Sequence, residues 1–118
     1  SHFLEHLPQP LIGPTLILWR DKLKASGFLE IHVPNVQEVF TRFVDAGTMA
    51  AKEMSLTQVY GHWTECYPHR WGFDMEMLAH ALREAGFTRL VRCASRLLPA
   101  NDQSSIGVRC QPDKARRP

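Results

Sequence analysis

The side chains best suited to chemistry in this 118-residue chain gather in one aromatic segment, residues 60–72. The segment has no helical or strand period, so it is predicted to be a long loop, and long loops of compact domains are often functional. Aromatic faces bind flat or methyl-bearing groups, and His or Arg side chains bind acidic groups. In the alternative interpretation, Trp63 and Trp71 cover a sheet and His69 caps the next helix. The predicted substrate-binding residues of the loop are His62, Trp63, Tyr67, His69, Arg70 and Trp71.

Three residues of the same loop, His62, Cys66 and His69, are of types that bind metal ions. They lack a fourth ligand and a CxxC or HxxxH spacing, so the sequence predicts no metal site. A nucleophilic Cys66 would need an orienting partner and an oxyanion loop, and neither is recognisable.

Two other places in the chain offer polar side chains. Near the amino terminus, His2 and His6 are four residues apart and could share one helical face, and Glu5 adjoins His6. These residues either belong to a binding or catalytic site or orient the start of a helix. Asn35 follows a predicted strand, so it either caps the next helix or touches a substrate at the carboxyl end of that strand.

Helices and strands that alternate along the chain must position these side chains. An apolar stripe predicts a first helix with Arg20 on its polar face, ended by Gly27. A β-rich strand follows, and Asn35 then begins a second helix before a weaker third one. The predicted bounds are residues 14–25, 36–46 and 50–59 for the helices and 28–35 for the strand.

The second half of the chain has clearer boundaries. Asp74 is a natural N-cap for a helix over residues 75–85, and Gly86 ends it. Two strand-like runs follow, over residues 88–94 and 105–110, close enough to form a hairpin. The order of elements predicts an α/β domain.

Composition excludes several classes of protein. Hydrophobic residues make up 44% and charged residues 22%, which is typical of globular proteins and not of disordered chains. The net charge of +2 gives no clear basic face for nucleic acid. No apolar stretch is long enough for a membrane span. Three cysteines without CxxC spacing fit reduced thiols, so a cytoplasmic protein is expected.

Four stretches together resemble the carboxyl-terminal half of a class I S-adenosylmethionine-dependent methyltransferase. SHFLEHL is similar to the "xxVLEHL" segment after the fourth strand of that fold, and LKASGFLEI with VPN to its "LKPGGxLxI" and "VPD" around the fifth strand. HRWGFD is similar to "HxxxYD" and LREAGF to "LLxEAGF". In this chain the four stretches are residues 1–7, 23–35, 69–74 and 82–87.

The resemblance implies an α/β fold, the carboxyl-terminal portion of a Rossmann-like sheet with about three strands. The last two strands would form an antiparallel hairpin, with helices flanking the sheet. It implies that S-adenosyl-L-methionine is the methyl donor and that a small molecule or another group is the acceptor. His6 and His69 would be catalytic, as bases for the acceptor's proton. Cofactor contacts would come from His2, Glu5 and His6, and acceptor contacts from Asn35 and the six loop residues named above.

The chain also departs from the family's pattern. Ala25 and Ser26 stand where Pro-Gly is usual, and Asn35 where Asp is usual. The seven glycines never fall as GxG, so the cofactor-binding turn of the fold is missing. With Ser1 in place of a start methionine, these departures suggest a fragment of the enzyme, inactive alone. Its domain would span residues 1–112, before a basic, disordered tail over 113–118.

A second hypothesis belongs to another class of protein. The chain could be a non-catalytic α/β interaction module that binds a protein through an exposed strand edge or through the aromatic loop.

Overall fold

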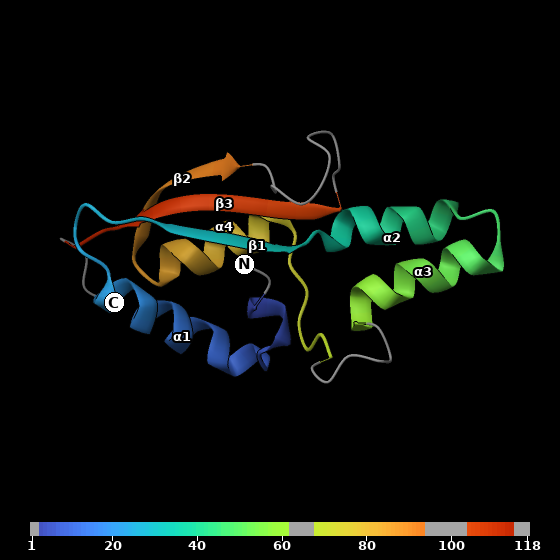
Figure 1. The fold of residues 1–118 in the computed structure, drawn as a ribbon, viewed down its shortest axis with the longest axis horizontal. Helices are drawn as coiled ribbons and strands as arrows, with labels where there is room; N and C mark the ends of the chain where they lie inside the picture. The colour runs from blue at the N-terminus through green and yellow to red at the C-terminus, as the bar shows by residue number, and fades with distance from the viewer. Residues whose placement is uncertain (1–2, 62–67, 94–103, 115–118) are drawn as a thin grey trace.

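The computed structural model describes residues 3–61, 68–93 and 104–114 of the chain. Its described part is an α/β fold in which four helices and one short 3-10 helix accompany a three-stranded sheet (Figure 1). The elements are η1 (Leu4–His6), α1 (Gln9–Lys22), β1 (Leu29–Pro34), α2 (Val36–Asp45), α3 (Met49–Tyr60), α4 (Met75–Glu84), β2 (Phe87–Cys93) and β3 (Ser105–Pro112).

The sheet has the strand order β1-β3-β2, and β3 runs antiparallel to both neighbours. The predicted hairpin of the last two strands is therefore confirmed. Since β1 and β2 are both antiparallel to β3, they point the same way, and their carboxyl ends lie at the same end of the sheet. β1 is an edge strand of the sheet in the described residues.

The core lies on one face of the sheet. Side chains alternate between the two faces of a strand, so Ile31 and Val33 of β1 share a face with Ile106 and Val108 of β3. Figure 1 shows α4 passing behind the strands, and α1 and η1 complete the same layer. The fully buried side chains contributed by these helices include Leu4, Leu16, Leu78 and Leu82.

The opposite face of the sheet, called the open face below, carries Glu30 and His32 of β1. Arg109 and Gly107 of β3 lie opposite them in the strand register, and Cys93 of β2 pairs with Gly107. Among the described helices, those that pack on the sheet contribute to the core on the other side.

The first helix differs from its prediction. It begins at Gln9, five residues earlier than expected, because Pro10 occupies the first turn, where a missing N–H costs nothing. Pro14 therefore lies inside the helix. The helix ends at Lys22, before Gly27, because Leu23 already has extended backbone angles.

Arg20 is also placed differently from its predicted exposed position. Its side chain is buried and donates hydrogen bonds to two carbonyl oxygens, from Nε to Gly86 (3.2 Å) and from Nη2 to Asp113 (2.6 Å). These carbonyls lie just before β2 and just after β3. Arg20 thus joins α1 to both ends of the hairpin, and the Lys114 ammonium donates to the Arg20 carbonyl (2.8 Å).

The other predicted helices and strands agree with the structure to within two residues at each end. Of the predicted tail over residues 113–118, residues 115–118 lie outside the described residues. Asp74 caps α4 by accepting a hydrogen bond from the Met77 amide (2.7 Å). Gly86 follows α4 with a φ of 94°, the left-handed conformation in which glycine is favoured.

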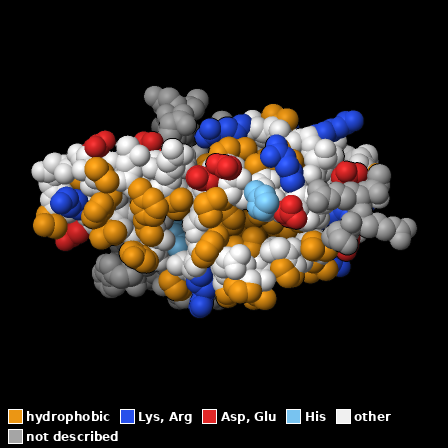
Figure 2. Space-filling model, turned by 180° about the vertical axis from the view of Figure 1, so that it is seen from behind, with side chains coloured by type: hydrophobic (Ala, Val, Ile, Leu, Met, Phe, Trp, Pro, Cys, Tyr) orange, Lys and Arg blue, Asp and Glu red, His pale blue; other side chains and the backbone are white. Residues whose placement is uncertain are grey.

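The α2–α3 hairpin projects from the end of the sheet and accounts for much of the molecule's 51 Å length (Figure 1). Val39 is the buried residue of α2 and Ser55 that of α3. Figure 2 shows hydrophobic side chains spread over this part of the surface. The large exposed ones are Phe40, Val44, Met49, Met54, Leu56 and Tyr60. Within the described residues, no helix is both long and apolar enough to span a membrane.

Candidate functional site

Three segments distant in sequence meet at the carboxyl end of β1. Asn35 forms a parallel bridge with Phe73, and the Val36 amide donates to the Phe73 carbonyl (3.0 Å). The Glu5 carbonyl accepts hydrogen bonds from the amides of Arg70 (2.6 Å) and Trp71 (3.2 Å). The amino-terminal turn and the end of the aromatic loop are therefore held together by backbone hydrogen bonds.

Two histidines lie against each other at this junction. The ring centroids of His6 and His69 are 4.8 Å apart, and the ring planes are 71° from parallel. His6 Nδ1 lies 3.2 Å from the Pro68 carbonyl oxygen, and His69 Nδ1 lies 3.0 Å from that of Gln58. A carbonyl oxygen only accepts, so Nδ1 is the protonated nitrogen of each neutral ring, which leaves the lone pair on Nε2. Both histidines can therefore act as bases at Nε2.

The buried side chain of Glu5 lies next to His6. Its side chain is 1% exposed, and its Oε1 is 4.0 Å from Nε2 of His6.

A cavity of about 390 Å³ opens beside His69, between the α2–α3 hairpin and the end of the aromatic loop. Its walls are mostly apolar, and its polar residues are Tyr60, His69 and Arg70. A small apolar pocket with a few convergent polar groups is the usual form of a ligand site. The lining residues are Val36, Phe40, Val59, Tyr60, His69, Arg70, Trp71, Gly72 and Met77.

Gly72 fits this wall because it has no side chain. A β-carbon at Gly72 would lie 2.5 Å from Cγ1 of Val36, so the loop passes α2 more closely than another residue would allow.

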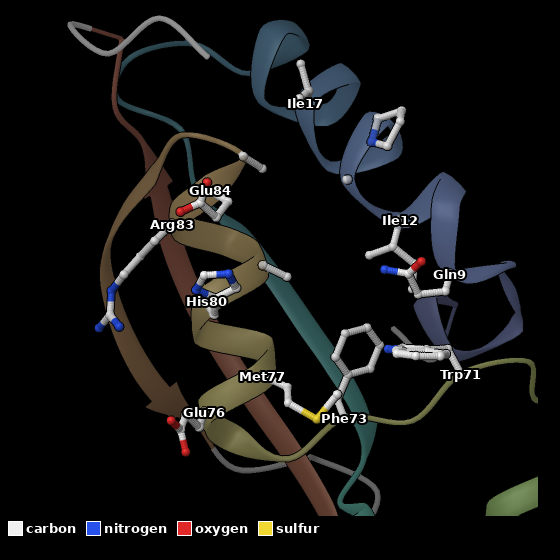
Figure 3. Close-up of a pocket in the computed structure, with 14 residues that line it drawn as sticks. Gln9, Ile12, Ile17, Trp71, Phe73, Glu76, Met77, His80, Arg83 and Glu84 are labelled. Carbon is white, nitrogen blue, oxygen red and sulfur yellow. The ribbon is translucent and has the colours of Figure 1, made fainter.

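A larger groove of about 760 Å³ lies between α1 and α4 (Figure 3). Figure 3 shows Phe73 between the two helices and Ile12 facing it from α1. Trp71 and Met77 line this groove as well as the smaller cavity, so they separate the two. The rim on α4 is charged, with Glu76, Arg83 and Glu84.

The structure brings six of the residues predicted from the sequence to one junction: Glu5, His6, Asn35, His69, Arg70 and Trp71. Asn35 occupies the N-cap position of α2, but its side chain makes no capping hydrogen bond to the described helix. The predicted residues His2, His62, Trp63 and Tyr67 lie outside the described residues, as does Cys66.

Six cavity residues were missed by the sequence prediction: Val36, Phe40, Val59, Tyr60, Gly72 and Met77. Val36 and Phe40 were read only as part of the apolar stripe of α2. The exposure of Phe40 beside the aromatic loop becomes visible only once α2 and α3 are known to stand away from the sheet.

Comparisons of the chain with protein-family models, curated proteins and solved structures found no match.

Proposed function

We propose that this chain forms the acceptor side of an S-adenosylmethionine-dependent methyltransferase, the carboxyl-terminal part of its Rossmann-like domain. The observation that carries the proposal is the paired His6 and His69 beside an aromatic-walled cavity at the carboxyl end of β1. In open α/β sheets, ligands bind outside the carboxyl ends of the strands.

The sheet supports the same assignment. The hairpin of β2 and β3 is the arrangement that the family resemblance implies for the last two strands. β1, which resembles the fifth strand of the fold, lies at an edge where a preceding strand of a larger sheet would pair.

The chemistry asked of the protein is positioning and proton transfer. The sulfonium is already reactive, so aligning the acceptor with it supplies much of the rate. An acceptor hydroxyl or amine loses a proton as it gains the methyl group. In this proposal His69 accepts that proton at Nε2, and Arg70 binds an acidic group of the acceptor.

The residues of this chain do not by themselves fit the methyl donor. None of the seven glycines forms a GxG turn that would bring backbone N–H groups to the donor. We therefore assign no step of donor binding to these 118 residues. Calorimetry with S-adenosylmethionine is expected to show no micromolar binding, and micromolar binding would contradict this division of roles.

The function is tested on the chain extended by whatever reading frame precedes Ser1 in its genome. The expected extension encodes a GxGxG turn after a strand, and the extended protein transfers a radiolabelled methyl group from the donor. His69→Ala is expected to slow transfer by about 10²–10⁴-fold, the usual contribution of a general base. His80→Ala, on the exposed side of α4, is the matched control and should leave the rate unchanged. An extension without the turn, or without donor binding, would overturn the proposal.

A second candidate function rests on the edge position of β1. An edge strand presents unpaired backbone groups that can add a strand from a partner protein. If the chain is an interaction module, the extended protein should transfer no methyl group from the donor.

A further inference from the structure

The open face of the sheet holds a cluster of metal-ligating side chains that is separate from the histidine pair. Glu30 and His32 are two residues apart on β1 and so point to the same face. Cys93, at the end of β2, reaches this face from the far side of β3. One ligand atom from each of the three lies within 4.8 Å of the others.

Gly107 makes this meeting possible. It lies on β3 between His32 and Cys93 in the strand register. A β-carbon at this position would be 2.5 Å from Cε1 and 2.7 Å from Nδ1 of His32 and would also collide with the Cys93 carbonyl oxygen. The imidazole of His32 thus lies across the central strand in space that only a glycine leaves open.

The distances are close to those of a coordination shell. Nε2 of His32 is 2.9 Å from Oε2 of Glu30. Tetrahedral zinc binds nitrogen and oxygen at about 2.0–2.2 Å and sulfur at about 2.3 Å, which places its ligand atoms about 3.3–3.8 Å from one another. Small side-chain movements would bring the three atoms to these separations.

The types of the ligand atoms favour a particular class of ion. A set of one nitrogen, one oxygen and one sulfur ligand suits zinc and similar transition metals, whereas magnesium and calcium prefer oxygen alone. Three protein ligands with a fourth position open to water is the arrangement of catalytic zinc sites. We propose that Glu30, His32 and Cys93 bind a zinc-class divalent ion on the open face of the sheet.

The surroundings of Glu30 fit this role. Arg109 donates from Nη2 to Oε1 of Glu30 (2.8 Å), so it holds the carboxylate by the oxygen that His32 does not contact. Such a partner orients a metal ligand from outside the coordination shell.

Cys93 must lose its proton when it binds the ion. Binding forms the metal–sulfur bond and releases one proton to water.

The test is a titration of the 118-residue protein with Co²⁺, a spectroscopic substitute for zinc. Coordination by Cys93 is expected to produce a thiolate-to-cobalt charge-transfer band that Zn²⁺ abolishes by displacing the cobalt. Cys93→Ser removes the band, and Cys66→Ser, the matched control, retains it. Glu30→Gln weakens Co²⁺ binding at least about tenfold, since even outer-shell changes cost about 10–100-fold.

Gly107→Ala tests the site independently, because this substitution changes none of the three metal-binding residues. Its β-carbon is expected to push His32 off the central strand and weaken Co²⁺ binding. Circular dichroism shows whether each variant is folded, and His32→Gln serves if Cys93→Ser is not. Absence of binding by the unaltered protein below millimolar Co²⁺ would overturn the proposal, as would a band that survives Cys93→Ser.

Discussion

Gly86→Ala is expected to destabilise the protein through two separate effects. The residue has a φ of 94°, and an L side chain in the left-handed region costs about 1–2 kcal/mol. The new β-carbon would also lie 2.5 Å from Nε and 2.8 Å from Cδ of Arg20. The guanidinium would have to move, although it is hydrogen-bonded to the carbonyls of Gly86 and Asp113.

The size of the second effect follows from those hydrogen bonds. A hydrogen bond to a charged group contributes about 1.5–3 kcal/mol, so losing one of the two adds that amount to the backbone strain. The expected total is about 2.5–5 kcal/mol, a large share of the roughly 5–15 kcal/mol by which domains are stable. Gly13→Ala is the control, because a β-carbon there meets nothing within 4 Å. It should stabilise α1 by up to about 1 kcal/mol.

Guanidinium unfolding followed by circular dichroism measures these changes. A double-mutant cycle separates the two effects, because in an Arg20→Ala background Gly86→Ala should cost only the strain of about 1–2 kcal/mol. An equal cost in both backgrounds would refute the steric contact with Arg20. A cost below about 0.5 kcal/mol in the unaltered protein, the size typical of a neutral surface change, would refute the whole argument.

Three further outcomes are expected. The pKa of Glu30 is lowered from 4.5 to about 2, and the hydrogen bond from His32 is the largest cause. The charged Glu30 side chain therefore stabilises the folded protein fully above about pH 4.5, and this stabilisation is lost as the pH falls toward 2. Acid unfolding of Glu30→Gln should lack that dependence. Burial raises the pKa of Cys110 to about 12, so iodoacetamide should label it only on unfolding and more slowly than the partly exposed Cys93. Asp74→Ala should lower the unfolding free energy by about 1 kcal/mol in a denaturant titration, because α4 loses its cap.

Local signals predicted most of the elements correctly. The apolar spacing and the caps of α4 are properties of neighbouring residues, so Asp74 and Gly86 could be read directly. The limits of α1 could not, because Pro10 and Pro14 both suit a first turn, and burial of Ile12 in the core selects the earlier start.

Contacts between distant residues were harder to predict. The burial of Arg20 depends on two carbonyls 66 and 93 residues away, which no local pattern records. The pairing of His6 with His69 likewise depends on the backbone bonds between η1 and the loop. The Glu30 and His32 spacing was visible in the sequence, but Cys93 joins them only through the strand order β1-β3-β2.

The sparse burial of the α2–α3 hairpin has a consequence for how the candidate cavity behaves over time. Local unfolding free energies are lowest where few apolar side chains are buried, and Val39 and Ser55 are the buried residues of this hairpin. Its amide protons should therefore exchange with deuterium faster than those of β1 and β3. One wall of the cavity is built on this hairpin, so a ligand that fills the cavity would slow exchange in α2 and α3 while the sheet stays unchanged.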